Sequence, residues 1–165
     1  MNLEIERKFL LKRMPNEKPD EVIKMDQWYL NVNGIYERVR QRQWKSTGKI
    51  DWIHTIKEDY DEISRIETEK LISGDEYHEF IKKCKHPDSD ARYIQKRRHL
   101  YKNGNDTWEV DEFLETSLIV AEIEIPNKEY KVDIPEYISE NLICEVSEMR
   151  EFSNKNLSDK IWKKD

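Results

Sequence analysis

Along most of the chain, apolar and polar residues alternate with a period of two, the pattern of β-strands whose two faces meet different surroundings. The alternation predicts strands at residues 2–11, 26–32, 35–44, 50–58, 62–71, 91–102, 106–114 and 118–125. Turn signals separate these segments at Asn33-Gly34, Thr47-Gly48, Asp59 to Asp61 and Asn103-Gly104-Asn105. Because such short links join neighbouring strands, we expect an antiparallel sheet.

Helices are predicted where apolar residues recur three and four positions apart instead. One begins at Ser73-Gly74-Asp75 and carries Tyr77, Phe80, Ile81 and Cys84. A second follows Pro135 and runs through Tyr137, Ile138 and Leu142, and a third follows Ser153 with Leu157, Ile161 and Trp162. No repeat or linker interrupts the chain, so residues 1–165 are expected to form a single domain.

Composition narrows the class of protein. Charged residues make up 39% of the chain and hydrophobic residues 36%, but the 5 Trp, 8 Tyr and 4 Phe are typical of a folded protein. The net charge of -6 argues against a nucleic-acid partner. The sequence has no apolar run of about 20 residues and no signal-peptide pattern, so we expect a cytoplasmic location without a membrane partner.

The first strand carries the first chemical signal. Glu4, Glu6 and Lys8 share one face of it, because side chains two residues apart project together. Adjacent carboxylates raise each other's pKa unless a cation neutralises them, so a divalent metal ion beside Glu4 and Glu6 is one physical solution. A solvated strand face is the other interpretation of this strand taken alone.

Rows of like charge recur in the later strands, and this repetition favours a binding site over a solvated strand face. The basic positions are Arg38, Arg40, Arg42, Lys57, Lys96 and Arg98, and the acidic pairs are Glu67 with Glu69, Glu109 with Asp111, and Glu122 with Glu124. Two architectures would fit: a barrel with an apolar interior and a charged exterior, or a closed sheet whose charged faces line a cavity. Signs are usually mixed on a solvated surface, so their segregation favours the cavity, where a basic and an acidic wall would hold a metal-phosphate complex.

The opening segment, Glu4-Ile5-Glu6-Arg7-Lys8-Phe9-Leu10, resembles the Glu-x-Glu-x-Lys signature of the CYTH superfamily, the triphosphate tunnel metalloenzymes. Further segments follow in the family's order: Tyr36-Glu37-Arg38-Val39-Arg40, Thr55-Ile56-Lys57, Arg65-Ile66-Glu67-Thr68-Glu69, Lys96-Arg97-Arg98, Trp108-Glu109-Val110-Asp111 and Ala121-Glu122-Ile123-Glu124. The resemblance covers most of the chain and implies a short bacterial-type member. Its fold would be α+β and mainly antiparallel β, a closed eight-stranded β-barrel with flanking helices.

The resemblance also implies roles for individual residues. By position, the divalent metal ion, Mg²⁺ or Mn²⁺, would be held by Glu4, Glu6, Glu122 and Glu124, which together with Lys8 would form the catalytic set. Phosphate would be bound by Lys8, Arg38, Arg40, Lys57, Lys96 and Arg98, and further acidic tunnel residues would be Glu67, Glu69, Glu109 and Asp111. Near the C-terminus, Glu145-Val146-Ser147 and Phe152-Ser153-Asn154 resemble the family's closing segment, with Phe152 in place of Tyr and Glu151 in place of a basic residue.

The expected function is metal-dependent hydrolysis of triphosphate, with inorganic tripolyphosphate cleaved to pyrophosphate and phosphate by a metal-activated water. Phosphoanhydride hydrolysis mainly needs positioning and charge compensation, and the short chain offers no evident element for a base or sugar. The alternatives are a nucleoside or thiamine triphosphatase, an adenylate cyclase, and a non-catalytic polyphosphate- or nucleotide-binding protein. The expected partner is a small phosphate-chain substrate, and the family adds a homodimer as an open expectation.

Overall fold

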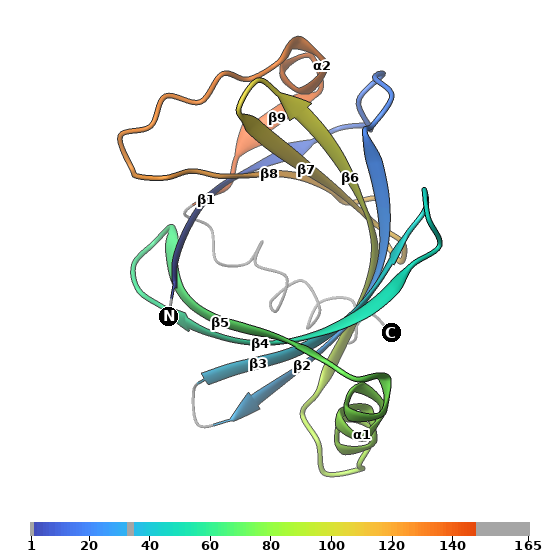
Figure 1. Cartoon of the computed structure of the whole chain (residues 1–165). Helices are drawn as coiled ribbons and strands as arrows, with labels where there is room; N and C mark the ends of the chain where they lie inside the picture. The colour runs from blue at the N-terminus through green and yellow to red at the C-terminus, as the bar shows by residue number, and fades with distance from the viewer. Residues whose placement is uncertain (1, 33–34, 148–165) are drawn as a thin grey trace.

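The computed structural model describes residues 2–32 and 35–147, and its main feature is a closed barrel of eight antiparallel strands (Figure 1). The strands are β1 (Asn2–Leu11), β2 (Glu21–Val32), β3 (Ile35–Trp44), β4 (Ile50–Asp59), β5 (Ser64–Ile72), β6 (Arg92–Asn103), β7 (Asp106–Phe113) and β8 (Ile119–Glu124). Around the barrel they follow the order β5-β4-β3-β2-β6-β7-β8-β1, and pairing of β1 with β5 closes it. The predicted fold class is confirmed. None of the helices described is long and apolar enough to span a membrane.

Most strand bounds agree with the alternation, and β2 is the main exception. It starts at Glu21, five residues before the predicted start. The prediction missed these residues because the adjacent apolar residues Val22 and Ile23 break the alternating pattern. Its early residues are nevertheless paired on both sides, with Ile23 opposite Trp44 of β3 and Arg98 of β6. The neighbours in the sheet, rather than local patterning, set the start of this strand.

A ninth strand, β9 (Leu142–Glu145), was not predicted. The second predicted helix is shorter than expected, since α2 (Glu136–Ser139) ends before Leu142, and Leu142 instead begins β9. One edge of β1 is shared: residues 2–5 pair with β5, and residues 9–11 pair with β9. Residues 142–145 therefore form a strand because the end of β1 offers them backbone groups that β5 does not pair. The Asn33-Gly34 turn, the third predicted helix, Glu151 and the Phe152-Ser153-Asn154 segment lie outside the described residues.

The apolar side chains of the barrel lie mainly on its outer face, under two covers. On one side Phe9, Trp108 and Ile123 pack with Ile138 of α2 and with the segment after β8, the orange chain in Figure 1. On the other side Val39 of β3 packs against Tyr77, Phe80 and Cys84 of α1 (Gly74–Cys84). Ser73 caps that helix by accepting a hydrogen bond from the Glu76 N–H. Burying the outer faces leaves the inner faces of the strands for charged residues.

Candidate functional site

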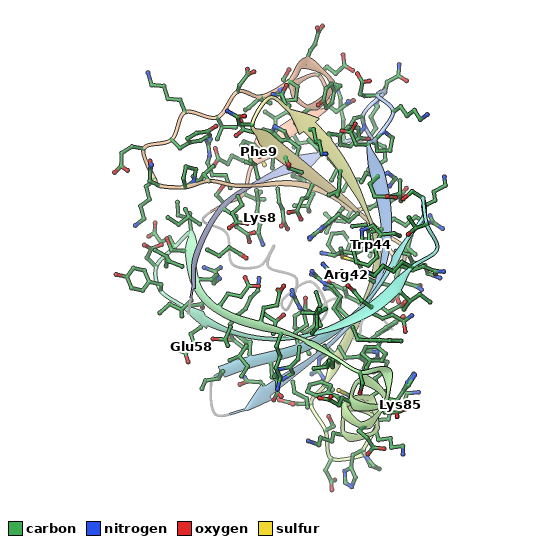
Figure 2. The ribbon with its side chains drawn as sticks, viewed as in Figure 1. Lys8, Phe9, Arg42, Trp44, Glu58 and Lys85 are labelled. Atoms are coloured by element: carbon green, nitrogen blue, oxygen red, sulfur yellow. The ribbon has the colours of Figure 1, made fainter. Side chains whose placement is uncertain are left out.

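A cavity of about 300 Å³ lies inside the barrel, and its wall is almost entirely charged. In Figure 2, Lys8 and Arg42 point into the barrel, whereas Phe9, the neighbour of Lys8, points to the outside. Besides Tyr29 and Tyr36, the lining residues are the acidic Glu4, Glu6, Asp59, Glu67, Glu69, Glu109, Glu122 and Glu124 and the basic Lys8, Arg38, Arg40, Arg42, Lys57, Arg65 and Arg98. The cavity architecture expected from the segregated charges is therefore the one that forms.

Lys96 and Asp111 are the two predicted site residues that do not line this cavity. Both are fully buried, with Lys96 Nζ 2.6 Å from Asp111 Oδ2. Arg98, two residues after Lys96 on the same face of β6, lines the cavity and donates two hydrogen bonds to Asp111, at 2.8 and 2.9 Å. A second carboxylate, that of Glu109, lies 2.5 Å from Arg98. Lys96 and Asp111 thus form a buried pair beside Arg98, whose charge is compensated by carboxylates.

Arg38 and Arg40 on β3 have a different environment. Their exposed fractions are 4% and 7%, and neither forms an ion pair within residues 2–32 and 35–147. Arg38 donates to the hydroxyl of Thr55 at 3.1 Å, and its buried Nε has no hydrogen-bond partner in the described part of the chain, while Arg40 Nε donates to the amide oxygen of Gln27. Burial together with the neighbouring Arg38 and Arg98 lowers the pKa of Arg40 to about 9, so the guanidinium stays charged at neutral pH. Buried guanidinium groups with neutral partners have the charge and the planar donor geometry that suit an anion such as phosphate.

Carboxylates gather on the opposite side of the cavity, on β1, β8 and β5. Two ammonium groups lie between pairs of them. Lys8 Nζ is 3.3 Å from Glu6 and 3.7 Å from Glu122, and Lys57 Nζ is 3.3 Å from Glu4 and 3.7 Å from Glu67. Glu124 lies opposite Glu6 in the β1–β8 ladder, so like charges are direct neighbours across the strands.

The negative charge of these carboxylates is larger than the positive charge of the two lysines beside them. Burial raises the pKa of Glu4 to about 7, and Glu67 and Glu6 add to the rise against the opposing effect of Lys57. Burial and the charge of Glu6 likewise raise the pKa of Glu122 to about 7. Burial raises the pKa of Glu6 as well, but Lys8 and Lys57 outweigh it and bring the value down to about 2. Repulsion within this group would be relieved by an added cation.

The same group can be tested for its fit to a divalent metal ion. In the described part of the chain, no three His, Cys, Asp or Glu side chains are grouped closely enough to hold a metal as they stand. The donor chemistry does fit, because carboxylate oxygens are the ligands that Mg²⁺ and Mn²⁺ prefer. Burial raises the pKa values of Glu4 and Glu122, so an added cation would favour their ionised, metal-binding form. Glu4, Glu6, Glu122 and Glu124 all line the one cavity.

Several residues of the site were missed in the sequence. Arg65 lies in the same inward row as Glu67 and Glu69, and that row was its available signal. Tyr29 lines the cavity and Gln27 is fully buried beside it, but both are neutral, so a search for rows of charge passes over them. Gln27 meets its charged partner, Arg40, across the β2–β3 ladder, which the sequence does not show.

Comparison with known proteins gives similarity along most of the chain. No family model matches. The inorganic triphosphatase of Acetivibrio thermocellus is 30% identical over 141 residues, which cover 84% of this chain and 84% of that protein. The structure of the inorganic triphosphatase NE1496 matches 93% of this chain and 96% of its own with a TM-score of 0.60 and 23% identity. The structure of HpAC1 from Hippeastrum, described as having a dominant triphosphatase activity, matches 76% of this chain and 81% of its own with a TM-score of 0.51 and 12% identity.

Proposed function

The chain belongs to the triphosphate tunnel metalloenzymes of the CYTH superfamily, and from this premise we propose that it hydrolyses inorganic tripolyphosphate to pyrophosphate and phosphate, with Mg²⁺ or Mn²⁺ as cofactor. The relative in Acetivibrio thermocellus is an inorganic triphosphatase, and its similarity extends over 84% of each chain. The region of similarity thus includes most of the barrel that carries the site.

One observation carries the proposal: Arg38 and Arg40 are buried in the cavity wall without a carboxylate partner in the described structure, while carboxylates crowd the opposite side. Taking an ionised group out of water without a counter-charge is costly, so such a pair is retained where an anionic ligand compensates it. A phosphate chain with a divalent cation supplies a negative charge to one side and a positive charge to the other. The cavity of about 300 Å³ is at the lower end of the roughly 300–1,000 Å³ usual for small-molecule sites, which favours a small substrate.

In this proposal the basic residues bind the phosphate chain and the acidic residues bind the metal ion. The guanidinium groups of Arg38 and Arg40 would bind phosphate oxygens in the bidentate manner that their planar geometry favours. Glu4, Glu6, Glu122 and Glu124 would hold the divalent ion. When bound, that ion neutralises charge on the phosphate oxygens and acidifies the attacking water. Lys8 and Lys57, placed beside these carboxylates, would supply point charges for the terminal phosphates.

The direct test is incubation of the purified protein with tripolyphosphate, ATP, thiamine triphosphate and pyrophosphate, with Mg²⁺, with Mn²⁺ and with a chelator. Released phosphate, pyrophosphate and cyclic nucleotide are measured separately. We expect metal-dependent turnover of tripolyphosphate above the other compounds. Preferential turnover of ATP or thiamine triphosphate would identify one of the alternative triphosphatases, cyclic AMP would identify a cyclase, and binding without any turnover would identify a sensor.

A matched pair of substitutions tests the acidic side of the site. Glu4→Gln and Glu6→Gln keep the shape of the side chain but remove its charge, so we expect loss of metal-dependent hydrolysis without loss of the fold. Glu58→Gln is the control, because Glu58 is exposed on the outer face of β4. Retained activity in both cavity variants would reject the assignment of these residues.

The compartment and the oligomeric state are part of the proposal too. We propose a cytoplasmic enzyme, which cell fractionation would test. Light scattering of the purified protein would decide between a monomer and a homodimer.

A further inference from the structure

Gln27 is the feature of the site that the charge pattern does not explain. It lies in β2, directly opposite Arg40 of β3, and its side chain is fully buried. Its amide oxygen accepts a hydrogen bond from Arg40 Nε, and its amide nitrogen donates to the hydroxyl of Tyr29 at 2.7 Å. One neutral side chain thus links two residues that line the cavity.

The chemistry of the partners fixes the direction of both hydrogen bonds. A guanidinium Nε–H can only donate, so the oxygen of the Gln27 amide must face Arg40 and its NH₂ group must face Tyr29. The Tyr29 oxygen is then an acceptor toward Gln27, and its own O–H remains free to donate to another group. Arg40, with Nε engaged, keeps its terminal nitrogens for a bidentate contact. Both cavity residues are therefore held as hydrogen-bond donors.

We propose that Gln27 is a positioning residue, which orients Arg40 and Tyr29 toward a bound phosphate chain and leaves the charge of Arg40 uncompensated. The proposal rests on the proposed function of the cavity. The neutrality of the amide is essential to it. A carboxylate at this position would form an ion pair with Arg40, as Asp111 does with Arg98 at 2.8 Å, and would compete with the phosphate for that cation.

Two substitutions separate orientation from charge. Gln27→Glu keeps an acceptor for Arg40 but adds a negative charge, so the KM for tripolyphosphate should rise about 10- to 100-fold, as expected for loss of one strong charge-assisted contact. Gln27→Met keeps the approximate volume and removes both hydrogen bonds, so we expect a rise of about 5- to 10-fold in KM together with a lower kcat. Gln43→Glu and Gln43→Met are matched controls, since Gln43 is exposed on the outer face of β3.

Calorimetry of tripolyphosphate binding with the metal chelated measures the same contact without turnover. We expect the affinity to fall in the order wild type, Gln27→Met, Gln27→Glu. In an Arg40→Leu background Gln27→Met should weaken binding less than it does in the wild type, because the part of its effect that acts through Arg40 is already absent and the two substitutions are then not additive.

The outcomes distinguish this inference from the proposed function. Wild-type protein that binds tripolyphosphate but does not hydrolyse it rejects the proposed function and leaves the role of Gln27 testable by affinity. Folded Gln27 variants with wild-type KM, kcat and affinity overturn the positioning role. Failure of both variants to fold, with normal folding of the Gln43 controls, also overturns it, because the amide would then serve the fold alone.

Discussion

Two sides of the same cavity carry arginines, and the partners of these arginines differ: carboxylates on one side and neutral groups on the other. On β6, Arg98 is held by Asp111 and Glu109. On β3, Arg38 and Arg40 contact only the neutral Thr55 and Gln27 among the described hydrogen-bond partners. Burial lowers the pKa of Arg98, but Asp111 and Glu109 outweigh it and raise that pKa well above its ordinary value. The pKa of Arg40 is lowered instead, by burial and by its neighbouring guanidiniums.

We infer from this difference that the charge of Arg98 serves the fold, whereas the charges of Arg38 and Arg40 are available to a ligand. A buried cation with its own carboxylates is stabilised within the fold and holds the wall together. A buried cation without them destabilises the fold until an anion binds. We therefore expect substitutions on β6 and β7 to act first on stability, and substitutions at Arg38 and Arg40 to act first on activity.

The largest expected effect is on catalysis. Replacing Arg38 and Arg40 together by Leu removes two charge-assisted contacts of about 1.5–3 kcal/mol each, so kcat/KM for tripolyphosphate should fall about 10²- to 10⁴-fold. The Tm should stay the same or rise, because two uncompensated buried charges are removed. Steady-state kinetics and thermal melting measure the two effects, and Arg97→Leu on the exposed face is the control. A large drop in Tm would contradict the comparison.

The next effect is on stability. Asp111→Ala leaves the charges of Arg98 and Lys96 buried without their shared carboxylate, which should cost about 3–5 kcal/mol of the free energy of unfolding. Urea denaturation measures this cost. A loss below 1 kcal/mol would show that the carboxylate is not what holds this wall.

Lys96→Met should have a smaller and pH-dependent effect. Arg98 still holds Asp111, so the cost near neutral pH should be about 1–2 kcal/mol. Burial lowers the pKa of Lys96 to about 7, against the partial compensation by Asp111. Above that pH the unfolded chain binds more protons than the folded protein, so this group makes the free energy of unfolding rise from about pH 7 toward 10.

The measurement is urea denaturation at pH 7, 8 and 9 for the wild type and for Lys96→Met. The rise should be weaker in the variant, whereas Lys83→Met on the exposed side of α1 should keep it. Equal pH dependence in all three proteins would argue against a lowered pKa of Lys96.

The smallest effect is expected at the third arginine of β3. Arg42 shares a row with Arg38 and Arg40 but forms two hydrogen bonds of 2.8 Å to Asp51 and lies over the ring of Trp44. Because its charge is compensated, Arg42→Leu should change KM by about threefold or less, in the range of partly exposed ion pairs. KM values for the three single variants, measured side by side, test the contrast within one strand. A tenfold change for Arg42 would show that a carboxylate partner does not predict a structural role.

Much of the barrel was predictable, because alternation is a local property. A strand with one face in a charged cavity and the other against a helix must alternate, and β1 and β3 have the predicted bounds. The prediction failed where a non-local partner decides. The start of β2 and the whole of β9 depend on backbone groups offered by neighbouring strands.

The site residues likewise divide into those that a local pattern predicts and those that depend on a neighbouring strand. The inward rows of β1, β3, β5 and β8 were predicted from their charges, whereas Gln27 and Tyr29 carry no charge and were missed. The family resemblance placed Lys96 among the phosphate-binding residues. In the fold its side chain is fully buried outside the cavity lining, where it pairs with Asp111.

By itself, the sequence determined which side chains share a strand face and which sign each face carries, because both follow from residue type and a two-residue period. Only the tertiary structure decided which charges are neutralised, because compensation depends on which strand lies opposite and at what register. Among the described residues, that choice gives Arg98 carboxylate partners and leaves Arg38 and Arg40 with neutral ones.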